Sequence, residues 1–149
     1  STNLKNLFGV SLTWSLAGFC VYLLSYYSSS FAGNFYVNFS MFSFTNVFTI
    51  GWASIISKKF ALVRVVQILL VLIIVLCGIT IALDETLSEK TKQTVIPIGL
   101  VILYLQCSTL QNYGYHAISA LFPVKVKGQA YGYVNFVTRP FSALAPILS

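Results

Sequence analysis

The chain of 149 residues is 57% hydrophobic and 8% charged, and its mean hydropathy is +0.83. This make-up excludes a water-soluble globular domain of ordinary composition and indicates an integral membrane protein. A formal net charge of +6 would suggest a nucleic-acid partner in a soluble chain. Here the basic residues lie at the borders of apolar segments, where they indicate membrane topology instead.

Five apolar segments are long enough for membrane helices of about 20 residues, and short polar breaks separate them. The alternation that is typical of barrel strands is absent. The predicted fold is therefore all-α, a polytopic bundle in one domain, residues 1–149. Its five transmembrane helices are expected at about 7–27, 35–57, 62–83, 95–121 and 129–149.

The predicted helices differ in their surfaces. The second is rich in Phe, Ser, Thr and Asn, which is typical of a helix that packs against neighbours or lines a cavity. The third is aliphatic on every side after Gln67 and is expected to face lipid. The fifth carries Arg139 directly before Pro140, with Pro146 further on, and these prolines predict a bent or broken helix near the arginine.

The charges predict an orientation in the membrane. With five crossings, one side holds six basic residues and no acid: Lys5, Lys58, Lys59, Arg64, Lys125 and Lys127. The other side holds all three acids: Asp84, Glu85 and Glu89, with Lys90 and Lys92. The positive-inside rule places the N-terminus on the cytoplasmic side, or its equivalent in an organelle. A plasma membrane and an organelle membrane such as the mitochondrial inner membrane are both compatible with this pattern.

Sequence motifs of catalytic, metal-binding or phosphate-binding sites are absent from the sequence. Cys20, Cys77 and Cys107 each lie inside a different apolar segment, which indicates packing residues and not a disulfide framework or a metal site. No paired nucleophile and base, carboxylate pair, metal-ligand spacing or phosphate loop is present, so we expect no enzyme and no cofactor. The chain begins without Met and ends inside an apolar stretch, as expected of a piece of a longer protein.

Two stretches, 14–39 and 120–148, carry a family pattern. The matching positions of the first are Trp14, Phe19, Tyr22, Gly33, Asn34, Tyr36, Asn38 and Phe39. Those of the second are Leu121, Phe122, Pro123, Lys127, Gly132, Arg139, Ser142 and Pro146. With them the chain resembles the C-terminal half of a major facilitator superfamily transporter, and within that superfamily the organic cation and anion transporter family. The stretches follow the family's seventh and eighth helices and its tenth and eleventh.

The resemblance implies a facilitator of two six-helix halves, with a substrate site between them at mid-membrane and alternating access. This chain would supply the seventh to eleventh helices, and the missing N-terminal half is an implied partner. The acids of the family's cytoplasmic gate are absent, since Ala120 and Asn46 stand where the family has glutamates. The basic residues of these gate loops therefore lack their usual partners: Lys58, Lys59, Arg64 and Lys127.

The resemblance also implies substrate-binding residues. Arg139 stands where anion and carnitine transporters of the family are typically basic, which implies a cavity arginine that pairs with a carboxylate. Alternatively, it is a structural arginine bound to backbone carbonyls freed by Pro140, or to a partner subunit. Phe19, Tyr22 and Tyr115 are the aromatic residues that would line the cavity, and the alternative for them is packing.

Two functions of different classes follow. The first is transmembrane transport of small organic ions, anionic or zwitterionic, by alternating access within membrane lipid. The second is a transporter-derived structural accessory subunit of a larger membrane protein complex, without transport activity. The position of Arg139 favours the first function, whereas the missing gate acids favour the second.

Overall fold

The computed structural model describes residues 2–27 and 35–148 and contains no strand within them. The all-α prediction is confirmed. These described residues form five helices in the order α1 (Thr2–Tyr27), α2 (Phe35–Lys59), α3 (Leu62–Thr86), α4 (Glu89–Leu121) and α5 (Val124–Leu148).

Each predicted helix corresponds to one observed helix, and the main differences are longer first turns. The starts of α1, α4 and α5 precede the predicted ones because polar first turns continue beyond the apolar run. α5 is continuous through Pro140 and Pro146, so these prolines do not break it. Ser149, the predicted last residue of the fifth helix, and the serine-rich stretch 28–34 lie outside the described residues.

Four helices are long and apolar enough to cross a membrane within the described part of the chain. These candidate spans are Leu4–Tyr26, Phe39–Ile56, Leu62–Thr86 and Lys90–Leu121. α5 has 25 residues, as many as α2 and α3, but Asn135, Arg139 and its two prolines make it less apolar. A membrane protein is confirmed to this extent, and the crossing by α5 stays a prediction.

Hydroxyl side chains inside the helices bond to their own backbone. Thr45 Oγ1 donates to the carbonyl of Met41 at 2.7 Å, and Thr109 Oγ1 to that of Leu105 at 2.7 Å. Equivalent bonds begin at other hydroxyls: Thr13, Ser25, Thr80, Thr86 and Thr138. Because lipid offers no hydrogen-bond partner, this satisfies each hydroxyl without help from a neighbouring helix.

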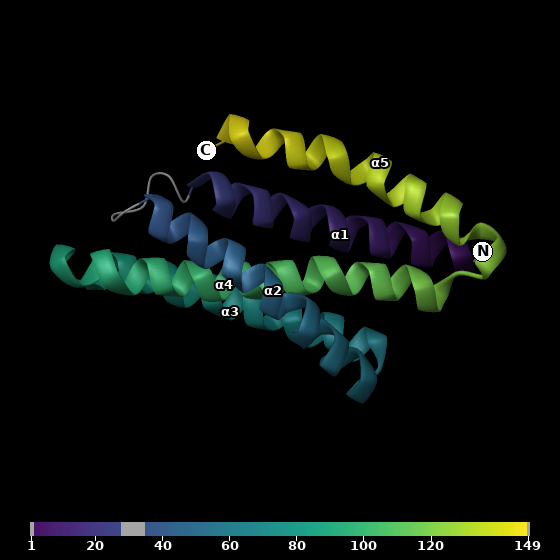
Figure 1. Cartoon of the computed structure of the whole chain (residues 1–149), viewed down its shortest axis with the longest axis horizontal. Helices are drawn as coiled ribbons and strands as arrows, with labels where there is room; N and C mark the ends of the chain where they lie inside the picture. Colours follow the sequence, from purple (N-terminus) through teal and green to yellow (C-terminus); the bar gives the residue numbers. More distant parts are fainter. Residues whose placement is uncertain (1, 28–34, 149) are drawn as a thin grey trace.

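The helices are arranged around α4 and α1 (Figure 1). α4 packs against α1, α2 and α3, while α5 packs mainly along α1. In Figure 1 α5, α1 and α4 follow one another across the bundle, α2 crosses α4, and α3 lies along α4. Two residues, Phe60 and Ala61, connect α2 to α3, and two others, Phe122 and Pro123, connect α4 to α5. Such short turns make neighbouring helices antiparallel.

Three buried apolar clusters follow one another along the bundle, and α1 and α4 contribute to all of them. The first joins α1, α4 and α5 through Trp14, Ile118, Phe122, Ala130 and Val134. The second joins α1, α3 and α4 through Ala17, Val65, Leu69, Leu110 and Tyr113. The third joins α1, α2 and α4 through Val21, Phe42, Leu103, Tyr104 and Cys107. The pair α1 and α4 thus holds the other helices.

The closest approach of α1 to α4 depends on a glycine. A Cβ atom at Gly114 would lie 3.3 Å from the indole of Trp14, which is 3% exposed. The Trp14 ring also meets the ring of Tyr115 edge-on, with centroids 4.3 Å apart. Tyr131 of α5 completes the cluster: its hydroxyl donates to the carbonyl of Tyr115 at 2.8 Å. Three helices therefore meet at one aromatic cluster.

Small residues form the contact between α1 and α5. Ser15 and Thr138 share a hydrogen bond of 3.2 Å between their buried hydroxyls. Gly18 lies against the same threonine, since its Cβ would be 3.3 Å from Thr138 Cγ2. Ala130 and Ala145 are buried on the same side of α5. Because lipid provides no hydrophobic force between helices, van der Waals contact at this close approach stabilises the α1–α5 interface.

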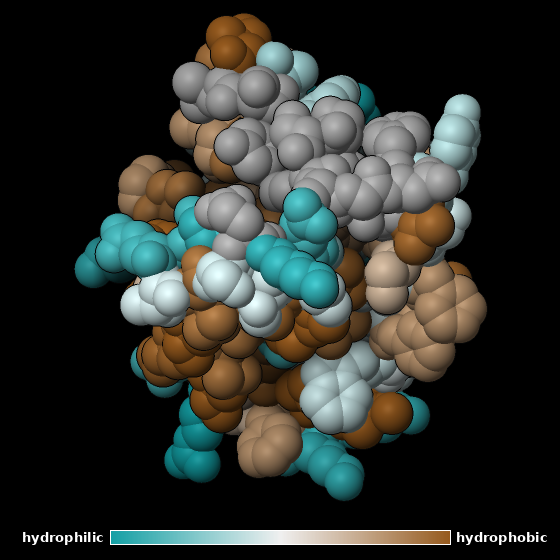
Figure 2. Space-filling view, turned by 90° about the vertical axis from the view of Figure 1, so that its left-hand side faces the viewer, coloured by the Kyte–Doolittle hydropathy of each residue, from teal (hydrophilic) through white to brown (hydrophobic). Residues whose placement is uncertain are grey.

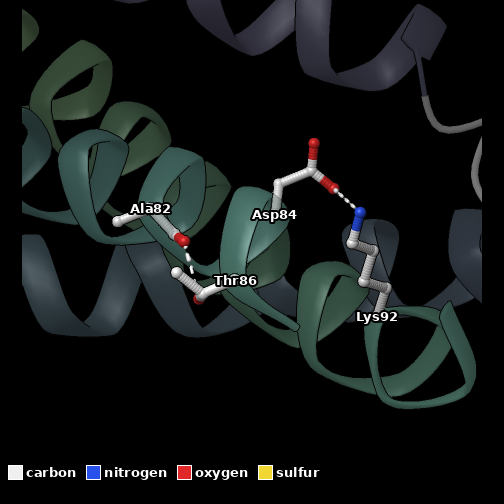
Figure 3. A network of polar contacts seen from close by, with 4 residues as sticks. All are labelled: Ala82, Asp84, Thr86 and Lys92. Carbon is white, nitrogen blue, oxygen red and sulfur yellow. Dashed lines mark hydrogen bonds and ion pairs between the residues drawn. The ribbon is translucent and has the colours of Figure 1, made fainter. Parts of the chain in front are cut away.

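The two ends of the bundle differ in charge. The basic residues of α1, of the α2–α3 turn and of the α4–α5 turn share one end, where the N-terminus lies (Figure 1). At the opposite end Lys92 Nζ lies 3.7 Å from Asp84 Oδ1 across the α3–α4 turn, next to the helix-terminal bond from Thr86 to Ala82 (Figure 3). Figure 2 shows hydrophilic side chains of this end among hydrophobic ones. The expected segregation of acids and bases is confirmed.

We expect Gly114→Val to lower stability by about 1 to 3 kcal/mol, because the new side chain overpacks against Trp14. Thermal unfolding in mild detergent measures the change. Gly78→Val is the matched control, since a Cβ at Gly78 meets nothing within 4 Å. Equal melting temperatures for the two variants would contradict the role of the α1–α4 contact.

Candidate functional site

A polar hydrogen-bond network links α2 to α4 in the middle of the bundle. Asn46 Nδ2 donates to the Tyr104 hydroxyl at 2.9 Å, and Ser108 Oγ donates to Asn46 Oδ1 at 2.8 Å. One turn further, Asn112 Nδ2 donates to Thr49 Oγ1 at 3.2 Å. The spacing of 104, 108 and 112 puts these α4 groups on one helix face. Both ends of the Asn46 amide are therefore satisfied by α4.

This network forms one wall of a cavity of about 380 Å³ between α1, α2 and α4. α1 contributes the opposite wall with Tyr22 and Ser25. The complete lining is Val21, Tyr22, Ser25, Asn46, Ile50, Tyr104, Ser108, Gln111, Asn112 and Tyr115. Tyr22 and Tyr115 are each 46% exposed, so the cavity is open at their side of the bundle.

The lining is polar but carries no formal charge. It offers amide groups at Asn46, Gln111 and Asn112 and phenol rings with hydroxyls at Tyr22 and Tyr115. Amides can both donate and accept hydrogen bonds, and phenol rings present an electron-rich face to cations. Such a surface can hold a small polar solute by hydrogen bonding and ring contact, and it requires a charged group from elsewhere to neutralise an ion.

The predicted substrate-binding residues fall into two groups. Tyr22 and Tyr115, from different helices, line the same cavity, as a shared site requires. Phe19 is half-buried on α1, and Arg139 is exposed on α5, and neither lines this cavity. The structure therefore brings together two of the four aromatic and basic candidates.

Arg139 lies on the exposed side of α5, outside the lining of this cavity. A Cβ at Gly18 would be 3.5 Å from the amide of Gln111, a cavity residue, and 3.6 Å from Ser142 Oγ on α5. Ser142 of α5 therefore lies near α1 and α4. Arg139, three residues earlier, is exposed and does not line the cavity of this chain.

The four predicted gate residues share one end of the bundle. Lys58 and Lys59 end α2, Arg64 follows in the first turn of α3, and Lys127 lies in the first turn of α5. None of these four side chains forms an ion pair with a described residue, as expected from the position of all three acids at the other end. Their role as a gate stays a prediction.

The three cysteines lie closer together than the sequence indicates. All are free, and Cys20 of α1, Cys77 of α3 and Cys107 of α4 belong to the same apolar cluster. No group of three His, Cys, Asp or Glu side chains suited to a metal ion occurs in residues 2–27 and 35–148. The three cysteines pack as small residues at the junction of three helices.

Tyr104 is one of several cavity residues that the sequence reasoning did not assign to the site; Asn46 and Ser108 are others. Tyr104 lies between apolar neighbours and resembles a lipid-facing aromatic, yet it is 4% exposed and accepts a hydrogen bond from Asn46. The spacing of Tyr104, Ser108 and Asn112 at four-residue intervals is the signal that could have identified this face.

No protein-family model, curated protein or solved structure matches this chain.

We expect Asn46→Ala to lower stability by about 1 kcal/mol, because it removes two interhelical hydrogen bonds worth about 0.6 kcal/mol each in membrane proteins. Chemical or thermal unfolding in detergent measures this loss. Asn135→Ala is the matched control, since the Asn135 amide bonds only within its own helix, to the Tyr131 carbonyl. If both variants unfold alike, the network does not hold α2 against α4.

Proposed function

We propose that this chain is part of a membrane transporter for small organic ions and contributes one wall of its substrate site. The observation that carries the proposal is the polar cavity between α1, α2 and α4. Polar groups in a membrane-spanning region are costly and commonly mark a pathway for solutes. The cavity residues Tyr22, Asn46 and Gln111 lie within the candidate membrane spans of α1, α2 and α4, respectively.

The proposal rests on the resemblance of the sequence to the C-terminal half of a major facilitator superfamily transporter. α1 and α4 occupy the centre, α2 and α5 flank them, and the most apolar helix, α3, packs mainly against α4. This leaves the open side of the cavity, with Tyr22 and Tyr115, for a second half that completes the site. In this proposal the five helices correspond to the seventh to eleventh, α5 crosses the membrane, and access alternates by movement of the halves.

The proposed substrate is an organic anion or zwitterion. The cavity supplies amides and aromatic rings without charge, and in this proposal the cation comes from Arg139, at the position where the resembled family is basic in anion transporters. A guanidinium binds a carboxylate through two parallel hydrogen bonds, which no lining residue of the cavity can replace. Arg139 would therefore contact the charged end of the substrate, while Tyr22 and Tyr115 contact its organic body.

The alternative function, a structural accessory subunit, has its own supporting observation. Lys58, Lys59, Arg64 and Lys127 find no carboxylate among the described residues, so a charge-paired cytoplasmic gate within this chain is lacking. In this case Arg139 would pair with a partner subunit of a larger membrane complex.

We expect Arg139→Ala to reduce uptake of an aromatic carboxylate to background, because the carboxylate loses the cation that this proposal assigns to it. Uptake is measured in liposomes with protein that is purified from its own membrane in mild detergent, with its partners retained. Lys90→Ala, at the acidic end, is the control. Normal uptake by Arg139→Ala would contradict the substrate assignment.

Two further outcomes distinguish the functions. A quaternary ammonium cation taken up as well as the carboxylate would contradict an anion site. Absence of uptake of any probe, together with unrelated subunits that copurify in fixed stoichiometry, would favour the accessory subunit. A free monomer without such companions would contradict that alternative.

We expect the basic end of the bundle to face the cytoplasm or its organellar equivalent. In a variant without native cysteines, Lys127→Cys should react with an impermeant maleimide only after sealed right-side-out vesicles are opened. Glu85→Cys should react before opening. The reverse pattern would overturn the orientation, and labelling of both before opening would contradict an odd number of crossings between them.

A further inference from the structure

A second cavity lies at the basic end of the bundle, on a different face. It is a groove of about 260 Å³ between α1 and α3, with α4 as its floor. Leu110, Gly114 and Ala117 form the floor, while Val10 lies on the α1 wall and Leu62 and Val66 lie on the α3 wall. α1 and α3 both pack on α4 but are not in extensive contact with each other, which leaves this space open.

The groove is apolar along most of its length and basic at one end. Lys5 and Asn6 line it near the start of α1, where the helix leaves the apolar span. Of its other polar groups, the Thr13 hydroxyl is already bonded to the Gly9 carbonyl at 2.9 Å, and Gln67 is exposed. An occupant that matches this lining has an alkyl chain and an anionic head.

Further basic residues share this end of the bundle with the groove, and the chain itself does not neutralise them. Arg64 is exposed beside Val63, a lining residue, and Lys58 and Lys59 end the preceding helix. All three acids of the chain lie at the opposite end of the bundle. Basic pockets between membrane helices at the headgroup level are typical binding sites for anionic lipid headgroups.

We propose that this groove binds one anionic phospholipid, with an acyl chain against the α4 floor and the headgroup phosphate between Lys5 and Arg64. The proposal goes beyond transport, because it depends only on insertion of the bundle in a membrane. The N-terminus of α3 adds to this positive potential, because the helix dipole is positive at that end. Ala61 at the N-cap position makes no side-chain cap hydrogen bond, so no side chain of this residue occupies the N–H groups of the first turn.

The test compares lipids on the full chain, delipidated in detergent and examined by native mass spectrometry. Phosphatidylglycerol should be retained in preference to phosphatidylcholine with the same acyl chains. The double variant Lys5→Gln with Arg64→Gln should bind phosphatidylglycerol about 30-fold more weakly, since each basic residue near a lipid surface contributes about a factor of five to six. Lys125→Gln, at the same end but outside the groove, should bind it normally.

A second variant tests the groove itself. Gly9→Leu places a side chain in the groove, and a Cβ at Gly9 meets nothing within 4 Å, so the fold should persist. It should lose phosphatidylglycerol, whereas Gly78→Leu, a matched change on α3 outside the groove, should retain it. Retention by Gly9→Leu equal to that of the unchanged chain would overturn the proposal.

Other occupants are separate outcomes of the same design. Glycerol phosphate that competes as well as phosphatidylglycerol would show a headgroup site without an acyl chain and would overturn the lipid assignment. The photoreactive variant Gly9→p-benzoylphenylalanine, cross-linked in the native membrane, should yield a lipid adduct. An adduct with another polypeptide would show that a protein segment fills the groove.

Discussion

The contact of Trp14 with Gly114 is the interaction on which the rest of the bundle depends. It lets α1 and α4 approach closely, and each buried cluster contains residues of both helices. α5 reaches the bundle mainly through α1, whereas α2 and α3 reach it through α4. A change that separates these two helices would therefore affect every other interface, including both walls of the polar cavity.

Lipid provides no hydrophobic force that drives helices together. Polar groups and small residues therefore hold the helices of this bundle together. The α1–α5 contact uses Gly18 and the Ser15–Thr138 hydrogen bond, while the α2–α4 contact uses Asn46 with Tyr104 and Ser108. The second contact also forms the wall of a cavity. The hydrogen bonds that hold α2 against α4 thus also position groups that a solute could bind. Asn46, Tyr104 and Ser108 therefore contribute both to helix packing and to the cavity lining.

Much of the fold could be predicted from the sequence, because long apolar runs separated by short polar breaks determine where the helices lie along the chain. The shared cavity of Tyr22 and Tyr115 was also expected. The role of Tyr104 and the exposed position of Arg139 were not, since both depend on how the helices are rotated. Arg139 points outward because small buried residues at Val134, Thr138 and Ala145 occupy the side of α5 that meets α1.

The two-residue turn between α4 and α5 has a consequence for biogenesis. An isolated helix with an arginine at its centre is disfavoured by a few kcal/mol during insertion by the translocon. α5 follows α4 after only Phe122 and Pro123, so it cannot be released into lipid far from its neighbours. In the proposed five-crossing arrangement, entry of α5 into the membrane is therefore coupled to that of α4 and to docking on α1.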